Sequence, residues 1–168
     1  MSIFVQYFKN NFTEFIVGSY DNKICLLDYR YRKNRNTIDN RMKKYLKTDI
    51  VFESTDIIEK AIVQIEEYFE KKRKTFDLPL LFVGSDFQKK VWTALVEVPY
   101  SQTSSYLDLA KKIGNEKAVR AVANANGANA LSIVVPCHRI IGTNKKLIGY
   151  AGGLELKKKL LDLESSNK

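Results

Sequence analysis

The chain has 168 residues, 45% of them hydrophobic, so it is long enough to bury one sizeable core or two smaller ones. Its 28 basic residues exceed its 19 acidic ones, and the formal charge of +9 favours either a polyanionic partner or a basic soluble surface. Two cysteines and one histidine exclude a disulfide framework and a Cys/His zinc cluster, so we expect no metal. No apolar run predicts a membrane span or a signal peptide, so we expect free thiols in the cytoplasm, or in the nucleus of a eukaryote.

The first part of the chain predicts a small antiparallel sheet. Its three short β-rich segments are residues 3–8, 13–20 and 23–29. Asp21-Asn22 gives the last two a tight hairpin connection. The next segment, residues 30–49, is polar and very basic, and it is either a loop with a short helix or a mobile segment. A solvated surface explains its charge better than a dedicated DNA contact does.

One amphipathic helix completes this half of the chain. It is expected to begin at Thr55-Asp56, and its apolar residues from Ile58 to Phe69 follow helical spacing. The composition then changes along residues 75–84, which resemble an extended linker. We therefore expect two domains, residues 1–83 and residues 84–168.

The second half predicts mainly helices. Their expected ranges are residues 86–98, 106–113, 116–126 and 154–164. Asp86 is expected to cap the first of them, and Ser105 opens a capping-box pattern before the second. Gly114 ends that short helix and Asn115 is expected to cap the next one. Helix, glycine-containing turn and helix is typical of a helix-turn-helix, although many other helical hairpins share the pattern.

The helix over residues 116–126 carries unusually small side chains. Ala118, Ala121, Ala125 and Gly127 leave one flank almost bare. A helix that reads bases in the major groove normally carries long polar groups, so this flank instead permits a close approach to a surface. That surface is either the protein's own core or the floor of a nucleic-acid groove. Arg120 stands among these residues, either as a surface or ion-paired cation or as a probe into DNA.

The strongest chemical signal lies in the segment 133–139, an apolar run that ends in Pro-Cys-His-Arg. His138 is the only histidine of the chain, and it directly follows the thiol of Cys137 and precedes the cation of Arg139. A thiol becomes a nucleophile when a neighbour lowers its pKa or accepts its proton. A buried strand with a structural cysteine is the alternative. Glu164, an isolated acid, either lies on the solvated surface or orients His138.

Glycines cluster after this segment. Gly149, Gly152 and Gly153 surround Tyr150 and predict a loop that takes positive φ angles or approaches another group closely. Such a loop could form the wall of a pocket for a planar ligand. In the closing helix, residues 157–159 are three lysines that we expect on the exposed side.

These motifs together resemble one known family. Residues 86–164 are similar to the catalytic domain of the O6-alkylguanine-DNA alkyltransferases. The shared pieces are Phe87 to Trp92, Val98 to Tyr100, Ser105-Tyr106, Leu109-Ala110, Arg120 to Asn126, Asn129, Pro136 to Arg139, Gly149 to Leu154, Lys157 and Glu164. The resemblance implies an α+β fold with a small antiparallel-sheet, ribonuclease-H-like N-terminal domain of structural role. The catalytic C-terminal domain is expected to be helical and to contain a winged-helix or helix-turn-helix DNA-binding motif.

The resemblance also implies DNA repair by direct reversal. An O6-alkylguanine, and possibly an O4-alkylthymine, would be flipped out of double-stranded DNA, and a monomer without cofactor would take the alkyl group once and irreversibly. Cys137 is implied as the acceptor, His138 as the base that acts through a water, Glu164 as the group that orients it, and Tyr106 as a donor to the flipped base. The implied DNA contacts are Ser105, Asn115, Ala118, Arg120, Ala121 and Arg139. The implied pocket residues are Asn129, Ile140, Tyr150, Ala151, Gly152 and Gly153.

The chain departs from the family pattern at a few positions. Ser101 stands where the family usually has glycine, Ala130 where it has proline, and Ala151 where some members have serine. Three other functions compete with repair: a DNA-binding regulator that uses the helix-turn-helix alone, a lesion-binding protein that does not repair, and a cysteine hydrolase. The first would not need Cys137 or His138, and the second resembles relatives that lack the cysteine.

Overall fold

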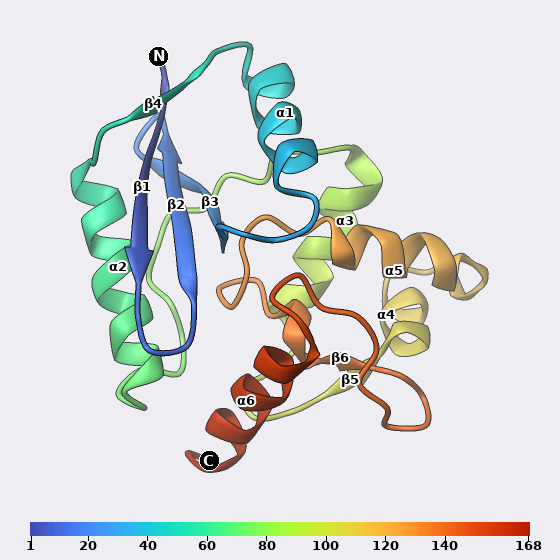
Figure 1. Cartoon of the computed structure of the whole chain (residues 1–168). Helices are drawn as coiled ribbons and strands as arrows, with labels where there is room; N and C mark the ends of the chain where they lie inside the picture. Colours follow the sequence, from blue (N-terminus) through green and yellow to red (C-terminus); the bar gives the residue numbers. More distant parts are fainter. The chain divides into compact units, whose positions relative to one another are not determined.

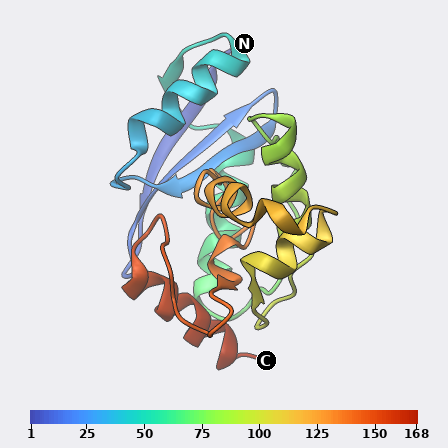
Figure 2. The same ribbon diagram turned by 90° about the vertical axis from the view of Figure 1, so that its right-hand side faces the viewer.

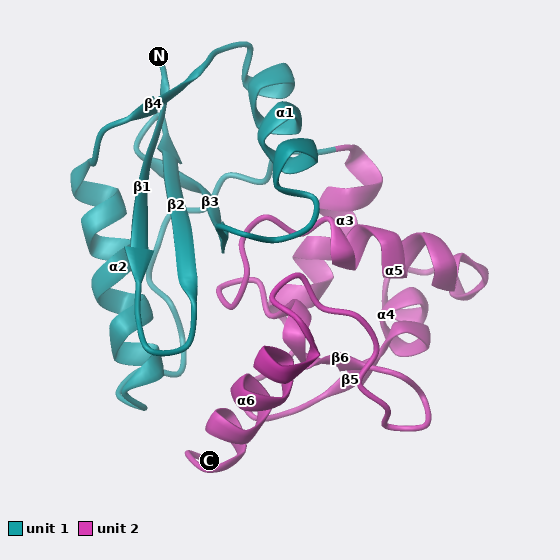
Figure 3. Ribbon diagram, viewed as in Figure 1, with its two compact units in different colours: residues 1–84 teal, residues 85–168 magenta.

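A computed structural model describes residues 1–168, and the chain divides into two compact units. Unit 1 comprises residues 1–84 and unit 2 comprises residues 85–168, coloured separately in Figure 3. The α+β class expected from the sequence is confirmed, because unit 1 contains a four-stranded sheet and unit 2 is mainly helical, with only the short two-stranded sheet β5–β6. No helix has the length and hydropathy needed to cross a lipid bilayer.

Unit 1 is built on a four-stranded sheet with the order β3-β2-β1-β4. Its elements are β1 (Ile3–Lys9), β2 (Glu14–Tyr20), β3 (Lys23–Tyr29), α1 (Arg35–Leu46), β4 (Ile50–Phe52) and α2 (Asp56–Phe69). The first three strands form the expected antiparallel meander. The short edge strand β4 was not predicted, and it pairs in parallel with β1.

Both faces of this sheet are covered. Phe15 to Ser19 in β2 and Ile24 to Tyr29 in β3 are buried, whereas the edge strand β4 is largely exposed. Figures 1 and 2 show α1 and α2 on opposite sides of the sheet. The predicted start of α2 is confirmed, and the Thr55 hydroxyl caps the helix by accepting a hydrogen bond from the Ile58 N–H.

The basic segment 30–49 is an ordered part of unit 1. Most of it forms the twelve-residue helix α1, whose apolar residues Ile38 and Met42 are buried. The fully buried carboxylate of Asp28 accepts hydrogen bonds from the guanidinium groups of Arg32 and Arg35, at 2.9 and 3.1 Å. A buried charge requires such partners, so two of the segment's cations stabilise the fold.

Unit 2 contains the predicted helices in the predicted order. Its elements are α3 (Asp86–Val96), β5 (Ser104–Ser105), α4 (Tyr106–Lys112), the 3₁₀ helix η1 (Glu116–Ala118), α5 (Val119–Gly127), the 3₁₀ helix η2 (Cys137–Arg139), β6 (Ile140–Ile141) and α6 (Leu154–Ser165). Two caps differ from prediction. Ser85 caps α3 in place of Asp86, and it forms a full capping box with Gln88. Asn115 provides no side-chain cap, because η1 separates it from α5.

The helical core of unit 2 is formed by α3, α4 and α5. Trp92 in α3 is buried, and its indole N–H donates to the carbonyl oxygen of Ala125 in α5 at 2.8 Å. The turn between α4 and η1 uses Gly114 at a φ of +78°, a backbone conformation that favours glycine. The packing of α3 and α4 on α5 fixes the end of α5, from which residues 128–136 lead to Cys137.

Candidate active site

A strained turn carries Cys137. Ile133 has a φ of +73°, which is rare for a β-branched residue, and its side chain is buried. The Val135 N–H donates to the Leu131 carbonyl at 2.8 Å, and the Cys137 N–H donates to the Val135 carbonyl at 2.8 Å. The turn therefore delivers Cys137 to the start of η2 with its main chain already hydrogen-bonded.

Asn129 attaches this turn to the end of α5. Its buried side-chain amide donates to the Val135 carbonyl at 2.9 Å, and its amide oxygen accepts from the Leu131 N–H at 3.0 Å. One side chain thus satisfies main-chain groups on both sides of Ile133. Asn129 therefore fixes the backbone of the turn that leads to Cys137.

The two cysteines lie in different surroundings. Cys25 is buried in β3, and burial raises the pKa of its thiol to about 12, so it is inert at neutral pH. Cys137 is also buried, but it precedes His138 and lies near enough to the Lys157 ammonium for the two charges to interact. A nearby cation and imidazole are the neighbours that promote thiolate formation.

Glu164 is the hub of the polar groups next to Cys137. Its carboxylate is fully buried in α6. It lies 2.6 Å from His138 Nε2, and it accepts hydrogen bonds from Arg139 Nε at 2.8 Å and from the Ser101 N–H at 3.1 Å. Burial alone would raise the pKa of Glu164, but the hydrogen bonds and charges of His138 and Arg139 outweigh it and lower the pKa to about 2. The group is therefore a carboxylate at neutral pH, and it lies in hydrogen-bond contact with His138.

His138 is held as a neutral imidazole. A carboxylate can only accept, so Nε2 carries a proton and donates it to Glu164, which leaves the lone pair on Nδ1. Nδ1 is buried and forms no hydrogen bond with another protein group. Burial lowers the pKa of His138, and although Glu164 opposes the shift, Arg139 and Lys157 add to it. Glu164 alone would favour the charged imidazolium, but the neutral form prevails.

Arg139 does not have the position of a DNA contact, and that prediction is corrected here. Its side chain is only 6% exposed. Its guanidinium donates through Nη2 to Glu164 at 3.0 Å and through Nη1 to the Val98 carbonyl at 2.7 Å. A buried carboxylate needs a paired cation, and Arg139 meets that need in place of binding phosphate.

Lys157 is a second correction. It was expected on the exposed side of α6, but it is fully buried. Its ammonium donates to the carbonyl oxygens of Ile140 at 2.6 Å, Ile148 at 3.1 Å and Gly149 at 3.2 Å. The Tyr106 hydroxyl donates to the same Ile148 carbonyl at 3.2 Å. Lys157 therefore joins Ile140, at the end of the Cys137 segment, to Gly149, at the start of the glycine cluster, and sequence reasoning missed this role.

The comparisons with known proteins agree with this site. A family model described as the DNA binding domain of 6-O-methylguanine DNA methyltransferase matches residues 86–166. The methylated-DNA–protein-cysteine methyltransferase of Methanosarcina acetivorans is 49% identical over 124 residues, which cover 74% of this chain and 80% of the relative. The chain belongs to the methylated-DNA–protein-cysteine methyltransferase family. The inducible member from Bacillus subtilis is 49% identical over 73% of this chain and 68% of its own length.

The family likeness extends over both units. The crystal structure of Mycobacterium tuberculosis OGT in complex with DNA matches 98% of this chain and 94% of that chain, with a TM-score of 0.83 and 32% sequence identity. Only residues 86–166 match the family model, so the structural similarity reaches beyond the part of the chain that this model matches. For a methyltransferase of this family, unit 1 is part of the common fold.

The methyltransferase's α5 presents one open face. Arg120 and Ala121 are exposed and Ala118 is half-buried, whereas Ala125 is buried against α3. The small-residue flank is thus divided: Ala125 packs in the core, and Ala118 and Ala121 leave the start of the helix open. Asn115 is also exposed, while the Ser105 hydroxyl accepts from the Asp108 N–H as the cap of α4.

The glycine-cluster loop supplies the last of the predicted pocket residues. Tyr150, Ala151 and Gly152 are half-buried, and Gly153 is exposed with a φ of +91° just before α6. Ile140 is buried, and its carbonyl is already used by Lys157. The structure therefore brings this loop and the Cys137 segment together through Lys157.

Replacement of Ser101 by glycine is expected to stabilise the methyltransferase by about 0.5 to 1 kcal/mol, because a non-glycine residue is disfavoured at positive φ. Ser101 has a φ of +63°, and its contribution to the site is its main-chain N–H, which glycine keeps. The gain is measured as a higher urea midpoint. Ser101→Ala retains a Cβ and should give no gain, so equal stabilisation by alanine would contradict the backbone explanation.

Proposed function

We propose that this chain repairs O6-alkylguanine in double-stranded DNA by direct reversal, as a methylated-DNA–protein-cysteine methyltransferase that transfers the alkyl group to Cys137. One observation carries the proposal: the thiol is followed by a neutral, buried imidazole that a buried, ionised Glu164 orients. Family membership supplies the reaction, and the arrangement of these groups supplies the roles. Unit 2 performs catalysis and unit 1 has a structural role.

The reaction begins with loss of the Cys137 proton. His138 accepts it at Nδ1, through a water, while Nε2 stays hydrogen-bonded to Glu164. Because the imidazole is neutral at rest, it can take this proton at neutral pH. The resulting imidazolium is stabilised by the Glu164 carboxylate, and the thiolate by the nearby Lys157 ammonium.

The thiolate then attacks the alkyl carbon in line with the guanine oxygen. The Sγ–C bond forms as the O6–C bond breaks, and the bonding electrons pass to the guanine. Tyr106 assists this departure as a hydrogen-bond donor. Burial raises the pKa of Tyr106, and negative charge on Cys137 adds to the shift, so the hydroxyl stays protonated. Its present acceptor, the Ile148 carbonyl, is exchanged for the base.

The open start of α5 is the part of unit 2 that approaches the DNA. Ala118 and Ala121 allow the helix to lie close to the floor of the minor groove, and the exposed Arg120 fills the space left by the flipped base. Flipping costs a few kcal/mol and is easiest for a weakly paired, damaged base. The formal charge of +9 supports a general attraction to the phosphate backbone. One monomer acts on one lesion and is consumed.

The test is the intact mass of the protein after it is mixed with a duplex that contains one O6-methylguanine. A gain equal to one methylene group is expected, because methyl replaces the thiol hydrogen. Cys137→Ser should show no gain. Cys25→Ala is the matched control, since Cys25 is a buried thiol whose pKa is too high for reaction, and it should gain the same mass as the natural chain.

Each other outcome identifies a different function. Tight binding to the lesion without a mass change would indicate a lesion-binding protein. A mass gain that survives Cys137→Ser and disappears in Cys25→Ala would move the acceptor to unit 1. Absence of both binding and transfer would show that this chain shares the family's fold without its reaction.

A further inference from the structure

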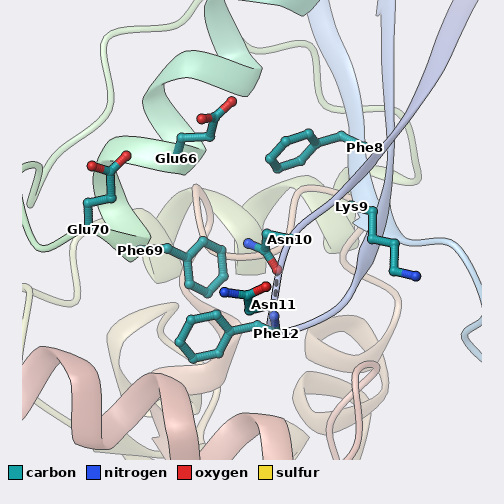
Figure 4. Close-up of a pocket in the computed structure, with 8 residues that line it drawn as sticks. All are labelled: Phe8, Lys9, Asn10, Asn11, Phe12, Glu66, Phe69 and Glu70. Carbon is teal, nitrogen blue, oxygen red and sulfur yellow. Dashed lines mark hydrogen bonds between the residues drawn. The ribbon is translucent and has the colours of Figure 1, made fainter.

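Unit 1 contains a pocket that the repair reaction does not use. It has a volume of about 290 Å³ and lies between the β1–β2 turn and the C-terminal end of α2. Its lining residues are Phe8, Lys9, Asn10, Asn11, Phe12, Glu66, Phe69 and Glu70. Figure 4 shows these side chains, with Lys9 pointing away from α2. The lining therefore combines aromatic rings, two carboxylates and two side-chain amides.

The aromatic part of the pocket is partly open to solvent. The rings of Phe12 and Phe69 lie 4.6 Å apart between centroids, and Phe12 is 37% exposed at the tip of a hairpin turn. The turn does not need the aromatic ring of Phe12 for its formation, since the Asn10 side chain already fixes the turn through hydrogen bonds. These rings offer a flat surface on which a planar cation can stack.

Two carboxylates at the pocket, those of Glu66 and Glu70, are placed where they destabilise the end of α2. Glu66 and Glu70 are four residues apart, a spacing at which like charges repel, and both lie at the negative end of the α2 dipole. Glu70 is paired with Lys72, whereas Glu66 forms no ion pair. A protein with a surplus of basic residues thus maintains an unpaired carboxylate beside the exposed ring of Phe12 and the half-buried ring of Phe69. Local arrangements that oppose stability are most often found where a ligand binds.

Asn10 provides a second, independent indication of a ligand. Its amide oxygen accepts from the Phe12 and Thr13 N–H groups at 2.8 and 3.0 Å. Its amide nitrogen is buried and has no hydrogen-bond partner. Figure 4 shows that nitrogen on the side of the amide that faces Phe69. A buried donor without an acceptor is uncommon and calls for one.

We propose that this pocket binds an arginine residue of a basic polypeptide. The guanidinium lies against the rings of Phe12 and Phe69 and donates to the Glu66 carboxylate, and the main-chain carbonyl of the same ligand residue accepts from Asn10 Nδ2. A simple cation meets only part of this arrangement, because Asn10 Nδ2 requires an acceptor and Glu66 requires a donor. A peptide-bound arginine offers both, together with a planar group that stacks on aromatic rings.

The test uses the full chain labelled with ¹⁵N and titrated with N-acetyl-arginine amide. Saturable shifts are expected for the backbone amides of residues 10–13 and for the Asn10 side-chain NH₂ signal. The citrulline analogue is uncharged and should bind about fivefold more weakly or not at all, as the ion pair and cation–π contact are lost. Agmatine keeps the guanidinium but lacks the carbonyl, so it should leave the Asn10 side-chain signal unmoved.

Variants locate the site and separate it from repair. Glu66→Gln should weaken binding of the arginine amide about fivefold. Glu53→Gln removes an exposed carboxylate of unit 1 outside the pocket and should leave the affinity unchanged. Neither change should affect methyl transfer, so the proposal and the repair function can fail separately. The absence of saturable shifts, equal binding of the citrulline analogue, or unchanged affinity in Glu66→Gln would each overturn the proposal.

Discussion

Replacement of Glu164 by alanine is expected to lower the free energy of unfolding by about 3 to 5 kcal/mol, the usual cost of removing one partner from a buried ion pair. The reason is the number of groups that depend on this carboxylate. Without it, Arg139 keeps a buried charge with only the Val98 carbonyl as a hydrogen-bond partner, and His138 and the Ser101 N–H lose their acceptor. Chemical denaturation measures the loss.

The same change should nearly abolish methyl transfer in the protein that remains folded. His138 would lose the group that fixes its tautomer, so Nδ1 would no longer be reserved for the Cys137 proton. Glu155→Ala is the matched control, because that carboxylate is on the same helix but 86% exposed and pairs only with Lys159. It should change the stability by less than about 0.5 kcal/mol. A small effect of Glu164→Ala would contradict the hub role.

Acid should reveal the contribution of Glu164 directly. Its pKa is lowered in the folded state, from an ordinary value of 4.5 to about 2. The folded state therefore binds fewer protons than the unfolded state in this range, and the stability that Glu164 contributes is complete above about pH 5 and lost as the pH falls towards 2. The stability difference between the natural chain and Glu164→Gln should shrink across that window.

The sequence predicted the order of elements well, because local patterns determine most of them. Short runs rich in β-forming residues marked β1 to β3, and the helical spacing of apolar residues marked α2. β4 escaped prediction because it is only three residues long and depends on its pairing with β1, which is distant in sequence. Helix α1 was hidden by its charge, since only Ile38 and Met42 of its apolar positions are buried.

The chemistry of the site was predictable only in part. The Cys137-His138 pair and its link to Glu164 followed from the rarity of histidine and from the family resemblance. The pairing of Arg139 with Glu164 could not be predicted in this way. A cation next to a nucleophile in a DNA-binding protein can bind phosphate or pair with a buried carboxylate, and only its burial distinguishes the two roles. The two wrong assignments, Arg139 and Lys157, are both cations that were expected at the surface and are buried instead.

Replacement of Lys157 by methionine is expected to loosen the loop between Ile140 and Gly149. Methionine preserves the unbranched shape but removes the ammonium, so three carbonyl groups lose a charged donor and only that of Ile148 keeps another, the Tyr106 hydroxyl. Hydrogen bonds to a charged group contribute about 1.5 to 3 kcal/mol each, and relief of the buried charge offsets part of the loss, so we expect a net destabilisation of about 2 kcal/mol.

Trypsin can measure this loosening, because Lys145 and Lys146 are exposed within the loop. Cleavage there should accelerate at least about tenfold in Lys157→Met, since cleavage follows the population of the opened loop. Lys158→Met is the matched control: its ammonium is on the same helix, is 68% exposed and pairs only with Asp162. Position 157 could have been recognised from the sequence, because residues seven apart share a helix face and Glu164 lies seven positions later. If Glu164 is buried as the orienting acid, Lys157 is buried with it. Equal rates of cleavage in Lys157→Met and Lys158→Met would show that the Lys157 ammonium does not hold the loop.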